Sequence, residues 1–127
     1  MNDKKTAVKK TIKTKPLLPT LRERKRYVGF QVISEKRFTE PEVSKKILEI
    51  TKEFFGTYLL AKAGIIILKN KYDEKDQTGI IKVSHKYVNQ LKTSLGLITK
   101  IKDYDAMIRT TTTSGILKKA LQRQPKK

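Results

Sequence analysis

The sequence predicts an α+β fold of the ferredoxin-like type, a split βαβ arrangement (βαββαβ) with one antiparallel sheet and a C-terminal basic helix. Two observations carry this prediction. Apolar residues alternate in some segments and recur at helical spacing in others, which separates strands from helices. The resulting order is strand, helix, strand, strand, helix, strand, helix, and its first six elements are those of ferredoxin-like domains, including the RNA-recognition-motif (RRM-like) class.

The first strand is predicted at residues 27–34, where apolar and polar positions alternate. Its inward-facing apolar residues are Val28, Phe30 and Val32. A helix follows Thr39, because Glu42 three residues later completes a capping box and Pro41 lies in the first turn. The apolar residues of this helix recur at helical spacing: Val43, Ile47, Ile50 and Phe54. Gly56 is expected to end it as the left-handed residue after the last turn.

The later elements are predicted from β-branched content, turn residues and apolar spacing. In order they are a strand at 59–70, a polar loop at 71–77, a strand at 79–83, a helix capped by Ser84, a strand at 106–112 and a short basic helix at 116–122. Gly64 is expected to form a bulge in the second strand. Two helices would then cover one face of the sheet, and the last helix would cover the other face or its edge.

The charge balance indicates a polyanionic partner. Thirty Lys and Arg residues oppose twelve Asp and Glu residues, which gives a net charge of +18. Such an excess repels itself unless a polyanion neutralises it. Half of the Lys and Arg residues lie in the two terminal segments, residues 1–26 and 115–127.

Composition divides the chain into three parts: a disordered basic arm at residues 1–17, one domain at 18–123, and a basic tail at 124–127. The arm lacks the apolar content that would offset the entropy of ordering it. It serves either as a polyanion-binding arm, which the charge favours, or as a solubility arm without specific contacts.

Several classes of function are excluded or disfavoured. The chain has no Cys and one His, so disulfides, thiolate–zinc sites, thiol catalysis and His-cluster metal sites are excluded. The longest apolar run, Ala63 to Leu68, is far shorter than the roughly 20 residues of a membrane helix. His85 has no neighbouring acid in the sequence that would orient it as a general base. The acids at 73–76 and 103–105 are explained more simply by solvent-exposed hairpin and strand-edge positions than by a metal site. We therefore expect an intracellular, cytoplasmic protein with no catalytic residue and no bound cofactor or metal.

The basic segment that leads into the first strand is the first candidate RNA-binding site. It comprises Arg22, Arg24, Lys25, Arg26 and Tyr27. Guanidinium groups held at a rigid sheet edge suit bidentate phosphate contacts, although a solvated face would have the same composition. The tyrosine either stacks on an unpaired base or closes the sheet.

The last helix carries the second candidate site. Its members are Ser114, Gly115, Lys118, Lys119 and Arg123. The lysines and the arginine would contact phosphates, and the amides near the helix start would offer an anion site. The strand at 79–83 has no aromatic residue, so recognition of RNA shape or backbone is favoured over a platform that reads single strands.

Three segments resemble a known family, archaeal ribonuclease P protein component 2, a counterpart of a Pop-type eukaryotic subunit. They are residues 18–27 (LPTLRERKRY) with Phe30 and 32–35, residues 78–82 (TGIIK), and Ser114-Gly115 followed by Lys118-Lys119. The resemblance runs from about Leu18 to Arg123. The chain departs from the family in having Ile116 where Thr is usual, which removes an expected hydroxyl contact, and in the Lys-rich arm from Met1 to Lys15.

The resemblance implies a non-catalytic subunit of ribonuclease P, the ribonucleoprotein that removes the 5′ leader of precursor tRNA. It implies that ribonuclease P RNA holds the active site and its magnesium ions. The implied protein partners are ribonuclease P protein component 3, in a heterotetramer with two copies of each, and the other protein subunits; precursor tRNA would be met indirectly. Two alternatives stay open: a general or ribosomal RNA/DNA-binding protein, and a small stand-alone nuclease.

Overall fold

The computed structural model describes residues 24–125, and the expected arm at 1–17 and Arg22 lie outside this range. Its elements are β1 (Lys25–Ile33), α2 (Glu40–Ala63), β2 (Ile66–Ile67), the 3-10 turn η3 (Lys69–Lys71), β3 (Thr78–Ser84), the 3-10 turn η4 (His85–Tyr87), α3 (Val88–Gly96), β4 (Lys100–Ile101), β5 (Tyr104–Asp105), β6 (Met107–Ser114) and α4 (Leu117–Gln122).

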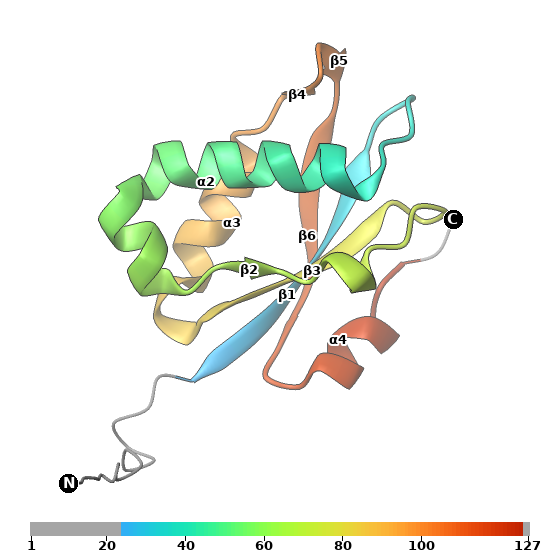
Figure 1. The fold of residues 1–127 in the computed structure, drawn as a ribbon. Helices are drawn as coiled ribbons and strands as arrows, with labels where there is room; N and C mark the ends of the chain where they lie inside the picture. Colours follow the sequence, from blue (N-terminus) through green and yellow to red (C-terminus); the bar gives the residue numbers. More distant parts are fainter. Residues whose placement is uncertain (1–23, 126–127) are drawn as a thin grey trace, which may run out of the picture.

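Four strands form one antiparallel sheet in the order β2-β3-β1-β6. The helices α2 and α3 cover one face of this sheet, and α4 lies on the other side (Figure 1). In β1, residues Val28, Phe30 and Val32 are almost fully buried, as their alternation predicted. The predicted ferredoxin-like βαββαβ fold is confirmed, and so is the strand around residues 27–34.

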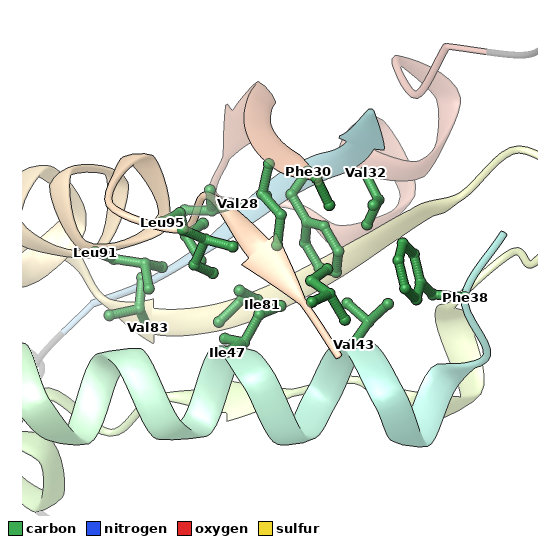
Figure 2. Packing of buried hydrophobic residues seen from close by; sticks show 14 of the residues in the cluster. Val28, Phe30, Val32, Phe38, Val43, Ile47, Ile81, Val83, Leu91 and Leu95 are labelled. Carbon is green, nitrogen blue, oxygen red and sulfur yellow. The ribbon is translucent and has the colours of Figure 1, made fainter. Parts of the chain in front are cut away.

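The core lies between the sheet and the two helices. Figure 2 shows apolar side chains of β1 and β3 facing those of α2 and α3. Its labelled members are Val28, Phe30, Val32, Phe38, Val43, Ile47, Ile81, Val83, Leu91 and Leu95. Because these residues occupy one face of the sheet, β1 and β3 present their alternate residues to α4 and to solvent.

The start of α2 confirms the predicted capping box. The backbone N–H of Thr39 donates to Glu42 Oε1 at 2.8 Å, and Lys102 Nζ lies 3.1 Å from Glu42 Oε2. The Thr39 hydrogen bond, followed by the Lys102 ammonium, lowers the pKa of Glu42 below its usual value. The same carboxylate thus caps α2 and ties it to the β4–β5 hairpin.

The prediction of a strand at 59–70 was wrong, because α2 continues to Ala63 and only Ile66–Ile67 is a strand. Gly56 does not end the helix; it kinks it with φ 76° and ψ 164°. Gly64, predicted to be a bulge, is the left-handed C-cap at φ 64°, and its N–H donates to Ala61 O at 3.2 Å. The residues after the kink are mostly good helix formers, and fully buried Ala63 packs them onto the core.

Two further local features differ from expectation. The second helix opens with the 3-10 turn η4 before α3 begins at Val88. The β4–β5 hairpin was not predicted, because its two-residue turn is Lys102-Asp103 rather than a typical glycine-containing pair. Both turn residues adopt positive φ, at 51° and 68°, as a type I′ turn requires.

Gly56→Ala is expected to destabilise the protein by about 1–3 kcal/mol, because the backbone of Gly56 lies in a region that only glycine adopts readily. A new Cβ would meet no neighbour within 4 Å, so conformation alone sets the cost. Urea unfolding measures the change. Gly96→Ala is the matched control: it also has open space but no positive φ, and should be neutral or slightly stabilising. A stabilising Gly56→Ala would contradict the kink.

Candidate nucleic-acid interface

Charge is segregated along the sheet. Residues 24–34, 77–102 and 106–125 contain no Asp or Glu. Apart from Glu49 and Glu53 on α2, the described acids lie where β1 ends and β3 and β6 begin: Glu35, Glu40, Glu42, Asp73, Glu74, Asp76, Asp103 and Asp105. We call this the acidic end of the molecule. At the opposite end of the sheet, no described acid opposes the cations.

We call that opposite end, where β1 starts and β3 and β6 stop, the basic end. Its cations are Arg24, Lys25, Arg26, Lys82, Lys86, Lys118 and Lys119. The strands bring them together: Lys25 pairs with Ser84 of β3, and Tyr27 pairs with both Lys82 and Ser114. The described residues of the first candidate site therefore meet Ser114, Gly115, Lys118 and Lys119 of the second at the basic end.

The strand register divides the N-terminal candidate residues between the two faces of the sheet. Tyr27 and Lys82 are directly opposite each other and lie on the α4 side. Arg26 pairs with buried Val83 and lies on the side of α2 and α3. The basic segment thus surrounds the end of the sheet instead of forming one row.

Arg26 and Lys25 have different structural surroundings. The Arg26 guanidinium donates to Lys25 O at 3.1 Å and lies beside Gly115, 3.5 Å from the position that a Cβ would take there. Arg26 therefore links the start of β1 to the turn before α4. The Lys25 ammonium lies 2.9 Å from the equivalent position on Gly64, at the C-terminal end of α2. A cation there favourably meets the negative end of the helix dipole.

In the turn before α4, one of the backbone amides that were expected to bind an anion is already hydrogen-bonded within the chain. The Ile116 N–H donates to the Ser114 hydroxyl at 3.0 Å, so this pair is satisfied within the chain. The helix α4 has only 6 residues, and Lys118 and Lys119 on it are exposed. Arg123 is exposed at the C-cap of α4, away from the basic end.

Lys82 and Lys86 are part of the basic end that the sequence analysis did not identify. Lys82 is half-buried beside Tyr27, and Lys86 is exposed in η4. The His85 N–H donates to Arg24 O at 2.8 Å, which fixes η4 against the start of β1. The absence of acids over 77–102 was the signal that would have pointed to these lysines.

The sheet face opposite the core is covered by α4. Ile80 of β3 and Ala120 of α4 are both fully buried, yet neither belongs to the core cluster on the other face. Tyr27 and Lys82 remain beside α4 at the basic end. Stacking several bases across the middle of this face would require α4 to leave, so the geometry suits contacts with RNA backbone and shape.

No group of three His, Asp or Glu residues in the described part of the chain is arranged to hold a metal ion. Within residues 24–125, no helix is both long and apolar enough to cross a membrane. The side chains of the basic end offer hydrogen-bond donors and positive charge.

The family model of the Rpp14/Pop5 family matches residues 26–124. Ribonuclease P protein component 2 of Thermococcus gammatolerans is 42% identical over 107 residues, which cover 84% of this chain and 88% of that protein. The component 2 proteins of Thermococcus kodakarensis and Pyrococcus abyssi are each 38% identical, covering 84% and 85% of this chain and 88% and 90% of theirs.

A chain in the cryo-EM structure of yeast ribonuclease MRP shares the fold, with a TM-score of 0.57 at 9% sequence identity. The match covers 79% of this chain and 85% of that one. The family match runs from Arg26 in β1 to just beyond α4, so it includes the core and the basic end except Arg24 and Lys25. By its sequence, this chain belongs to the Rpp14/Pop5 family.

Proposed function

We propose that this protein is an RNA-binding subunit of ribonuclease P and takes part in removing the 5′ leader of precursor tRNA. The observation that carries the proposal is the basic end, where cations from β1, β3, η4 and α4 meet without a described acid. The names of the related proteins support the same role. A general RNA/DNA-binding protein would share the charge but has no support from these relatives.

In this proposal the chain does not cut RNA itself. Ribonuclease P RNA supplies the active site and its magnesium ions, and the protein lowers the repulsion between phosphates where that RNA folds tightly. Arg24, Arg26, Lys82, Lys118 and Lys119 contact phosphates, and Tyr27 is placed to contact a base or sugar beside Lys82. Arg22 and the arm at 1–17, which lie outside the described residues, add contacts to the same RNA.

The proposal includes protein partners. The chain works with ribonuclease P protein component 3, as a heterotetramer with two copies of each, and with the remaining protein subunits in the cytoplasm. The segregation of charge allows the chain to bind both kinds of partner: RNA binds the basic end, and surfaces outside it stay available to proteins.

Cleavage of precursor tRNA by the cognate ribonuclease P RNA and component 3, with and without this chain, tests the proposal. We expect addition of the chain to increase the rate or to lower the magnesium concentration that cleavage requires. A chain that is folded and bound to the RNA, yet changes neither quantity, would contradict the subunit role and favour the general RNA-binding alternative.

A further inference from the structure

Gln124, which follows α4, is tied to the sheet by both ends of its side-chain amide. Its Nε2 donates to the backbone carbonyl of Gly79 in β3 at 2.7 Å. Its Oε1 accepts from the Thr111 hydroxyl of β6 at 2.5 Å. Gln124, which the sequence analysis placed at the start of the basic tail, therefore contacts both β3 and β6.

Two features of the sheet make room for this amide. A Cβ on Gly29 of β1 would lie 2.8 Å from Gln124 Oε1 and 2.8 Å from Thr111 Oγ1, so a side chain there would displace this pair. The register of β1 with β6 shifts between Gly29 and Phe30, whose partners are Thr112 and Thr110. Thr111 is the extra residue of this bulge, and its hydroxyl meets the amide of Gln124.

The helix α4 needs such anchors. It has 6 residues, and a helix of this length is unstable in water without tertiary contacts. Two apolar residues of α4 are shielded from solvent: Ala120 is fully buried and Leu117 is half-buried. Leu121, by contrast, is 37% exposed. Gln124 therefore supplies a second, polar attachment beyond the C-terminal end of the helix.

The position of α4 determines where two cations of the basic end lie. Lys118 and Lys119 directly precede Ala120 in α4, and within residues 24–125 neither side chain makes a hydrogen bond or ion pair with the sheet. Their distance from Arg26 is therefore set by how α4 docks. Preorganised cations bind without the cost of ordering them on association.

We propose that Gln124 is a positioning residue of the RNA surface: by joining β3 and β6 across Gly29, it fixes the helix that carries Lys118 and Lys119. The amide oxygen and the Nε2 group of Gln124 each make a hydrogen bond within the protein, so Gln124 acts through these lysines. This inference rests on the proposed function for its ligand, ribonuclease P RNA.

A double-mutant cycle tests this role. Gln124→Ala is measured in the wild-type background and in a Lys118→Ala/Lys119→Ala background, by affinity for ribonuclease P RNA and by hydrogen exchange of the α4 amides. We expect Gln124→Ala to speed exchange in α4 and to weaken RNA binding about threefold or more. In the Lys118→Ala/Lys119→Ala background, Gln124→Ala should cause no further loss of RNA affinity. Gly29→Ala, which displaces the amide, should reproduce both effects.

Gln122→Ala is the matched control, since Gln122 is an exposed glutamine on the same helix and should change neither readout. Equal losses in the two backgrounds would overturn the proposal, because Gln124 would then act independently of the lysines. Unchanged exchange in α4 would overturn it as well. If the wild-type chain fails to bind ribonuclease P RNA at all, the proposed function fails, while the exchange data still report whether Gln124 anchors α4.

Discussion

Replacing Arg26, Lys118 and Lys119 with Ala is expected to weaken binding to ribonuclease P RNA on the order of tenfold or more at moderate salt. These three cations come from β1 and α4 and lie at the basic end, where no described acid offsets them. Binding releases about one counterion from the RNA for each phosphate contact. Each contact that the variant loses should therefore reduce the slope of log affinity against log salt by roughly one unit. A filter-binding or fluorescence titration at several salt concentrations measures both quantities.

The control for this variant removes the same charge elsewhere. Lys45, Lys52 and Lys75 are exposed, and they lie on α2 and in the turn before β3. Their replacement with Ala lowers the net charge equally, so long-range attraction falls by a similar amount. We expect the salt slope of this control to stay close to that of the wild type. Equal effects of the two triple variants would mean that total charge, and not the basic end, determines binding.

Phe30→Ala is expected to destabilise the fold by about 3–5 kcal/mol, the usual cost of removing a large buried aromatic side chain. Phe30 is 1% exposed in the centre of β1. Its ring fills the space left by Gly79, where a Cβ would lie 2.6 Å from the ring atom Cζ. Because domains are stable by only about 5–15 kcal/mol, urea unfolding should show a large drop in midpoint.

Tyr58→Ala is the comparison for Phe30→Ala. Tyr58 is an aromatic residue of α2 that is 75% exposed, so its loss should change the free energy of unfolding by less than about 0.5 kcal/mol. Similar losses in both variants would contradict the placement of the core between β1 and the helices. RNA affinity at a temperature where the Phe30→Ala variant is folded should be unaffected, since Phe30 is buried in the core and is not part of the basic end.

The sequence predicted most of the fold because the signals that formed it are local. The alternation of Val28, Phe30 and Val32 and the capping box of Thr39 and Glu42 each depend on residues close in the chain. The error at 59–70 arose where local signals conflict: β-branched residues cluster only at 65–67, and Gly56 resembled a helix end. The helix continues to Ala63 because this residue is buried in the core, a tertiary contact that local signals do not reveal.

The candidate site was predicted as two separate basic segments, and their meeting could not be deduced from spacing alone. Strand register places Tyr27 opposite both Lys82 and Ser114, and register is a property of the assembled sheet. Lys82 was missed because an isolated lysine in a strand carries no local signal. Gln124 was assigned to a tail because its role depends on Gly29, Gly79 and Thr111, which are far from it in sequence.

Hydrogen exchange of the wild-type chain, free and bound to ribonuclease P RNA without other proteins, tests the account most directly. We expect RNA to slow exchange at residues 24–27, 82–86 and 114–119, which form the basic end. Exchange at 35–42, 73–76 and 102–105, which contain most of the acids, should be unchanged. Protection confined to the acidic end would contradict the proposal that this family member holds its RNA by the basic end of the sheet.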